Sequence, residues 1–227
     1  MIEAVVFDLD GVLLDSEQVW DEVREQYVRE RGGRYDAEIQ RAMMGMSSPE
    51  WSRFLHEEVG VGDAPEGIAT DVVRRMLARY RVELPLAPGA REAVERLGSR
   101  WPLGLASSSN RPLIDAALEL SGLAAFFRAT VSSEEVLRGK PAPDVYLEAA
   151  RRLGVPAERC AAIDDSHSGI RSAKAAGMRV VAIPNQHFPP GEEALEEAGA
   201  VLDGIGELTV EAVRADFGDP HAEGQSQ

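Results

Sequence analysis

Apolar positions in the first third of the chain follow two different periods. Residues 2–8 (IEAVVFD) form a short run rich in β-branched and aromatic side chains, which predicts a buried strand. From Ser16 to about Arg31 the apolar positions recur at helical spacing, with Trp20 and Tyr27 on one face. Three more helices are predicted beyond it, over residues 36–46, 49–59 and 66–82. Because no strand pattern interrupts this stretch, we expect an all-helical block.

The pattern changes after Pro88, where helical segments alternate with short apolar runs typical of strands. Strands are expected over residues 102–106, 128–131, 160–164 and 179–183, with a weaker one over 200–205. Such alternation implies βαβ units and a mostly parallel sheet. The fold class is therefore α/β: a Rossmann-like, mostly parallel sheet interrupted by a helical insert. The expected divisions are a core of residues 1–15 and 86–217, an insert of residues 16–85, and a polar, disordered tail of residues 218–227.

Composition narrows the class of partner. The 227 residues carry a formal charge of −15 with a pI of about 4.7, which argues against nucleic acid and against an anionic membrane surface. A small anionic ligand is still allowed, since it needs only local positive charge. The single cysteine, Cys160, fits a reducing compartment, and we see neither a signal peptide nor an apolar run of about 18 residues. We expect a cytoplasmic protein that is a monomer or a weak dimer.

Carboxylates gather where two of the predicted strands end. Asp8 and Asp10 follow the first strand, and Asp164 and Asp165 end the strand "CAAID". Ligands of open parallel sheets bind at the carboxyl ends of the strands, so these four acids share one edge. Clustered carboxylates repel unless a cation lies between them, and oxygen ligands suit Mg²⁺. The alternative for any single acid is a helix cap or a solvated loop residue.

Two further segments supply groups for an anion. The strand "GLAS" runs into three serines, Ser107 to Ser109, just before a predicted helix, where hydroxyls and N–H groups could bind phosphate. An ordinary helix cap is the alternative there. Lys140, in "RGKPAPDVY", is one of only two lysines among 24 basic residues, which hints that a compact ammonium is needed; an ordinary surface lysine is the alternative.

These segments, in this order, resemble the haloacid dehalogenase-like hydrolase superfamily, and within it the phosphatases with a helical cap after the first strand. The motifs are "DLDGVLLDSE", Ser107 after "LGLA", Lys140 in "GKPAPDVY" and "DDSHSGIRSAKAAGM" from Asp164. The resemblance covers residues 1–210 and implies Mg²⁺ as cofactor.

The resemblance also implies roles for the motif residues. Asp8 would be the nucleophile that forms an aspartyl-phosphate, and Asp10 the general acid and base, whose backbone carbonyl binds the metal. Asp8, Asp165 and Asp164 would hold Mg²⁺, directly or, for Asp164, as support. The other motif residues would hold the phosphoryl oxygens: Ser107, Ser108 and Lys140. Dehalogenases of the superfamily lack an acid at the position of Asp10, so its presence favours phosphoryl chemistry.

Residues of the cap are expected to recognise the substrate. Glu17 and Trp20 begin its first helix, "GMSSPEW" around Ser47 resembles a substrate-specificity loop, and Arg75 with its neighbours could meet a second anionic group. The alternative for each is cap packing or a solvated helix face.

Three hypotheses about function remain open. The first is a Mg²⁺-dependent phosphatase of a small sugar or polyol phosphate. The second is a β-phosphoglucomutase-like mutase, which is disfavoured because that branch has a histidine at the position of Trp20 and an arginine near Ser48. The third is a binding protein without catalysis, for which Asp10 would be unnecessary.

Overall fold

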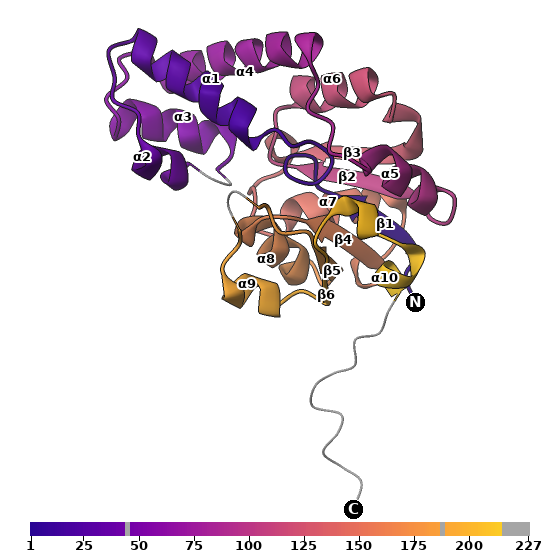
Figure 1. Cartoon of the computed structure of the whole chain (residues 1–227). Coiled ribbons are helices and arrows are strands. Elements are labelled where there is room, and N and C mark those ends of the chain that lie inside the picture. Colours follow the sequence, from indigo (N-terminus) through magenta and orange to yellow (C-terminus); the bar gives the residue numbers. More distant parts are fainter. Residues whose placement is uncertain (44–45, 187–188, 215–227) are drawn as a thin grey trace, which may run out of the picture.

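Four helices form one compact block between the first strand and the rest of the chain. The computed structural model describes residues 1–43, 46–186 and 189–214. The block contains α1 (Glu17–Glu30), α2 (Ala37–Ala42), α3 (Ser48–Glu57) and α4 (Pro65–Val82). In Figure 1 it lies to one side of the sheet. The helical insert predicted from the periodicity is confirmed, and α2 is shorter than the 36–46 expected.

The strands of the described residues form one parallel sheet of six strands, which confirms the α/β class. Its order is β3-β2-β1-β4-β5-β6, so β1 lies at the centre. The strands are β1 (Ala4–Phe7), β2 (Leu103–Ser107), β3 (Phe127–Ser132), β4 (Cys160–Asp164), β5 (Arg179–Ala182) and β6 (Ala200–Val201). The expected strand over 200–205 is cut to two residues and is followed by a bend and a short 3₁₀ helix.

Helices cover both faces of the sheet. They are α5 (Ala90–Gly98), α6 (Arg111–Ser121), α7 (Asp144–Leu153), α8 (His167–Ala175), α9 (Glu192–Glu196) and α10 (Val210–Arg214). Strand β1 shows the layering: Val5 and Phe7 pack into the core cluster shared with α5 and α6, whereas Ala4 and Val6 pack into the one shared with α7 and α8. Burial on both faces explains why the central strands read as continuous apolar runs. Helix α9 was not predicted.

The helical block is joined to the sheet by two segments that run side by side. Leu14 and Leu86 form an antiparallel bridge, and Asp15 N–H donates to the carbonyl of Pro85. The domain boundaries expected near residues 15 and 86 fall in these two segments and stay a prediction. The tail expected over 218–227 lies outside the described residues.

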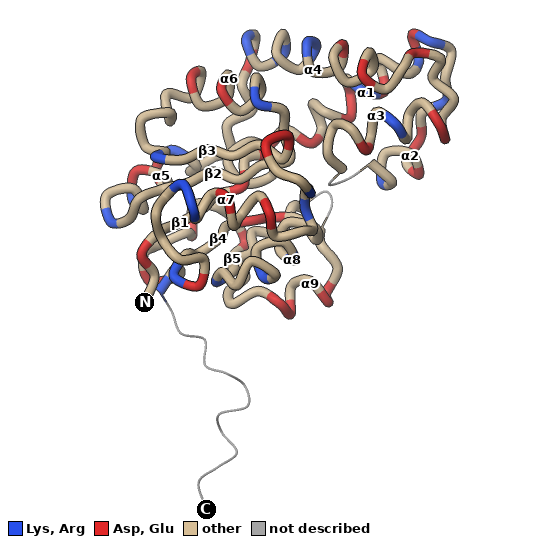
Figure 2. Tube along the Cα trace, turned by 180° about the vertical axis from the view of Figure 1, so that it is seen from behind, with Lys and Arg blue, Asp and Glu red and all other residues tan. Residues whose placement is uncertain are grey.

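None of the helices described here has the length and apolar character needed to cross a membrane. In the view of Figure 2, Lys and Arg positions alternate with Asp and Glu positions along the helices.

Candidate active site

Three buried carboxylates meet at the carboxyl ends of β1 and β4. The register pairs Phe7 with Ile163, and Asp8 N–H donates to the carbonyl of Ile163 over 2.8 Å. This pairing brings Asp8 beside Asp164 and Asp165, with ligand oxygens of all three within 4.8 Å of one another. Their exposed fractions are 6%, 0% and 2%. The acid cluster that the strand-end positions predicted is therefore present.

Lys140 enters this cluster from the loop before α7. Its Nζ lies 2.7 Å from Asp8 Oδ1 and 2.8 Å from Asp164 Oδ2, and the residue is only 6% exposed. Burial opposes the charge on the ammonium, but the two carboxylates raise the pKa of Lys140 above its usual value. Lys140 is therefore a buried, protonated cation and not a surface lysine.

The three acids differ in how their charge is compensated. Burial disfavours ionisation of Asp164, yet Lys140, the Tyr146 hydroxyl and the Ser166 N–H together lower its pKa. Burial raises the pKa of Asp8 to about 7, against the opposing effect of Lys140. Burial, reinforced by Asp164, raises the pKa of Asp165 well above its usual range. The protein alone therefore favours the ionised form of Asp164 but disfavours ionisation of Asp8 and Asp165.

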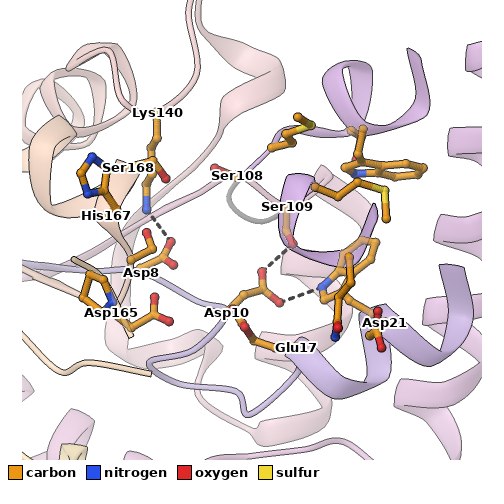
Figure 3. Close-up of a pocket in the computed structure, with 18 of the residues that line it drawn as sticks. Asp8, Asp10, Glu17, Asp21, Ser108, Ser109, Lys140, Asp165, His167 and Ser168 are labelled. Carbon is orange, nitrogen blue, oxygen red and sulfur yellow. Dashed lines mark hydrogen bonds and ion pairs between the residues drawn. The ribbon is translucent and has the colours of Figure 1, made fainter. Parts of the chain in front are cut away.

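Asp10 lies apart from these acids and faces the helical block. Its Oδ1 accepts hydrogen bonds from Ser16 Oγ (2.5 Å) and Trp20 Nε1 (3.1 Å), and its Oδ2 accepts one from Ser109 Oγ (2.6 Å). Figure 3 shows Asp8 and Asp10 turned to different neighbours. The metal-sized group of carboxylates includes Asp8, Asp164 and Asp165; within the described residues, the Asp10 carboxylate is not part of it.

The serines after β2 have different surroundings. Ser107 is fully buried, and its Oγ accepts a hydrogen bond from Ser109 N–H over 2.9 Å. Ser108 and Ser109 line the cavity, whereas Ser107 does not. The expected role of Ser107 in binding phosphate stays a prediction. In the structure its hydroxyl accepts a backbone hydrogen bond within the turn after β2.

A cavity of about 480 Å³ connects the acid cluster with the helical block. Glu17 and Trp20 line it, as expected, together with Asp21, Arg24 and His167. Burial, with the charge of Asp10 next in effect, raises the pKa of Glu17 to about 7. The central part of this cavity is visible in Figure 3.

The structure does not bring the other two expected cap residues into this cavity. Arg75 pairs with Glu30 and Asp71 on α1 and α4, at 2.6 and 3.1 Å. Ser47 caps α3 through reciprocal bonds with Glu50 and lies against a neighbouring hollow that also contains Gly139. Both are used by local structure: the spacing of Ser47 and Glu50 is a capping-box signal present in the sequence, whereas the pairing of Arg75 with Glu30 across two helices is not.

Several residues or contacts of the site were missed from the sequence. Ser109 bonds to Asp10, and Tyr146 bonds to Asp164 over 2.5 Å. Arg24 lies four positions after Trp20, on the same helical face, and this spacing was a usable signal. The run of serines marked Ser109 as a candidate for binding phosphate, but its bond to Asp10 could not be predicted, because the partner lies 99 positions away.

Comparison with known proteins shows the family to which the chain belongs. The model of the haloacid dehalogenase-like hydrolase family matches residues 2–177. A phosphorylated carbohydrates phosphatase from Thermotoga maritima is 34% identical over 202 residues, covering 88% of this chain and 93% of that protein.

Two solved structures share the architecture. CbbY from Rhodobacter sphaeroides, in complex with xylulose-(1,5)bisphosphate, superposes with a TM-score of 0.81 at 27% identity, covering 94% of this chain and 99% of that one. A β-phosphoglucomutase from Clostridium difficile superposes with a TM-score of 0.80 at 23% identity, covering 93% and 95%, a likeness that concerns the fold alone. The chain thus belongs to the haloacid dehalogenase-like hydrolase family and is an enzyme of the hydrolase class.

Proposed function

We propose that the protein is a Mg²⁺-dependent phosphatase that hydrolyses a small phosphorylated sugar or polyol through an aspartyl-phosphate on Asp8. The observation that carries the proposal is that Asp8 and Asp10 have different surroundings. Asp8 lies beside a buried ammonium and two further carboxylates, whereas Asp10 is held separately by hydroxyl and indole donors. A nucleophile and a proton donor need these two different environments.

The residues on β1 have complementary tasks in this proposal. A carboxylate oxygen of Asp8 attacks phosphorus while the bond to the leaving alcohol breaks. Asp10 donates a proton to that alcohol and later removes one from the water that hydrolyses the aspartyl-phosphate. Lys140, 2.7 Å from Asp8, neutralises charge on the nucleophile and on the phosphoryl group.

The donor set fits a divalent cation. Asp8, Asp164 and Asp165 offer hard oxygen ligands within 4.8 Å of one another, and Lys140 alone does not compensate three buried carboxylates. Mg²⁺ bound there would neutralise charge on the phosphoryl oxygens. Asp8, Asp164 and Asp165 would hold it.

The substrate class rests on the cavity and on the carbohydrate phosphatase relative. A volume of about 480 Å³ suits a ligand of sugar size. The mutase alternative needs the phosphoryl group to return to the substrate. Among the described residues no contact in the cavity favours that transfer, and Trp20 stands where the mutases have a histidine, so we retain the phosphatase.

The test is a panel of phosphorylated sugars and polyols assayed for phosphate release with Mg²⁺, including β-glucose 1-phosphate with coupled detection of glucose 6-phosphate. We expect phosphate release by the wild type and loss of turnover in Asp8→Asn. Glucose 6-phosphate formed without phosphate release would establish the mutase instead. Near-normal turnover in Asp8→Asn would remove the nucleophile from the proposal.

A further inference from the structure

Arg24 and Lys140 both line the cavity near the proposed active site, but they differ in their partners. Arg24 projects from α1 into the cavity that also contains Asp8 and Lys140. Lys140 is already paired with two carboxylates, at 2.7 and 2.8 Å. Among the described residues Arg24 makes no ion pair or hydrogen bond, and its Nε is buried without a partner.

Two tryptophans hold the guanidinium in place. Its Cζ lies 4.7 Å from the centroid of the Trp20 ring and 5.0 Å from that of Trp51. The two rings contact each other edge to face, with centroids 6.2 Å apart, and Trp51 is only 1% exposed. A guanidinium that contacts aromatic rings keeps its N–H donors free for a ligand, because the rings accept no hydrogen bonds from donors that lie in the guanidinium plane.

The nearby acids do not supply the missing acceptor. Asp21 accepts a hydrogen bond from the Tyr35 hydroxyl over 2.7 Å, and Asp10 is held by three donors. Glu17 lines the same cavity without an ion pair to Arg24. Arg24 as a whole is half-buried, but its Nε is buried, and a buried donor without an acceptor is costly, so an acceptor from outside the protein is the group that completes it.

We propose that Arg24 binds a second anionic group of the substrate, at the end remote from the phosphoryl group that is transferred. The inference rests on the proposed phosphatase function and makes it more specific. A carboxylate or a second phosphate fits the planar fork of donors and offsets the buried charge, whereas a neutral hydroxyl offsets none. The substrate is then a phosphorylated sugar acid or a sugar bisphosphate. The second-anion role expected for Arg75 passes to Arg24, because Arg75 is already paired outside the cavity.

The experiment compares three substrates that differ at the remote end: glucitol 6-phosphate, 6-phosphogluconate and glucose 1,6-bisphosphate. The value of kcat/KM for phosphate release is measured with Mg²⁺ for the wild type, Arg24→Met, Arg24→Lys and the control Arg74→Met. Arg74 lies on the outer surface of α4, with its side chain 71% exposed. Circular dichroism checks that each variant is folded.

We expect the wild type to prefer one of the anionic substrates over glucitol 6-phosphate by about tenfold or more. Arg24→Met abolishes this preference, Arg24→Lys retains part of it, and Arg74→Met keeps the wild-type ratio. The preferred anionic substrate identifies the group as carboxylate or phosphate. The inference is overturned if the wild type prefers the neutral substrate, or if Arg24→Met lowers all three values by the same factor.

A binding measurement separates this inference from the proposed function. Calorimetry in an Asp8→Asn background compares the affinities for the same three compounds with and without Arg24→Met. An Arg24-dependent preference for an anionic compound supports the inference even if no phosphate is released by the wild type. Hydrolysis of glucitol 6-phosphate alone, with no such preference in binding, leaves the phosphatase standing and removes the anion site.

Discussion

Individual carboxylates of this protein differ because their neighbours differ. Asp8 and Asp10 are separated by a single residue, yet Asp8 contacts Lys140 whereas Asp10 contacts Ser16, Trp20 and Ser109. The two side chains therefore have different chemistry despite their proximity in the sequence.

Asp10→Asn is expected to slow turnover by orders of magnitude for sugar phosphates and much less for p-nitrophenyl phosphate. The reason is that an alcohol needs a proton to leave, whereas p-nitrophenolate does not. Steady-state kcat/KM for both substrates measures the difference. Equal losses for the two leaving groups would show that Asp10 is not the proton donor.

The raised pKa of Glu17 predicts that the free energy of unfolding depends on pH. Its pKa is raised to about 7, mainly by burial, so the folded state binds its proton more tightly than the unfolded state does. The stability it contributes is fully present below about pH 4.5 and is lost as the pH rises through about 7. Relative to Glu17→Gln, the metal-free wild type should lose on the order of 1 kcal/mol of unfolding free energy between pH 5 and pH 8.

Urea unfolding in EDTA at both pH values measures this loss. Glu22→Gln, an exposed change on the same helix, is the control and should show no such trend. A constant difference between wild type and Glu17→Gln would contradict the raised pKa.

At the scale of elements, helix α8 begins close to the end of β4 and packs against Asp164 of the acid cluster. A Cβ added at Gly169 would lie 2.0 Å from Asp164 Oδ1, so the helix can begin this close to the strand only with glycine. Asp164 cannot move aside freely, because Lys140, Tyr146 and Ser166 all bond to it.

Gly169→Ala should therefore lower the unfolding free energy by about 1–3 kcal/mol, as overpacking does. Gly67→Ala is the matched control in α4, where a Cβ would meet nothing within 4 Å. Removing a helical glycine there should raise stability by about 0.5–1 kcal/mol. Denaturant unfolding distinguishes the two, and a stabilising Gly169→Ala would refute the packing argument.

At the scale of the whole molecule, folding assembles a cluster of acids from distant parts of the chain. Asp8 ends β1, and Asp164 and Asp165 follow some 150 residues later at the end of β4. The overall charge of −15 adds to the cost of concentrating acids there.

Mg²⁺ should therefore stabilise the fold by about 2.7 kcal/mol at a hundredfold excess over its Kd, seen as a higher Tm. Asp165→Asn should raise the Tm of the metal-free protein, since it removes a buried carboxyl whose ionised form the fold disfavours, and should abolish most of the response to Mg²⁺. NaCl at equal ionic strength is the control for screening. A Tm of the wild type that Mg²⁺ leaves unchanged would contradict the cation site.

The sequence by itself determined the class of fold and the core of the site. Helical and strand periods are local properties, so the insert of α1–α4 and the parallel sheet could be predicted from them, as could the acids at strand ends. Short elements were harder, because β6 and α9 depend more on their neighbours than on their own pattern.

Only the tertiary structure decided which polar groups meet. It paired Asp10 with Ser109 across 99 positions, turned the Ser107 hydroxyl to a backbone N–H, and placed Arg24 rather than Arg75 in the cavity. These outcomes depend on contacts between elements far apart in the chain, for which periodicity carries no information. The chemistry at the strand ends is thus encoded locally, whereas the surroundings that distinguish one acid or one arginine from another arise from packing.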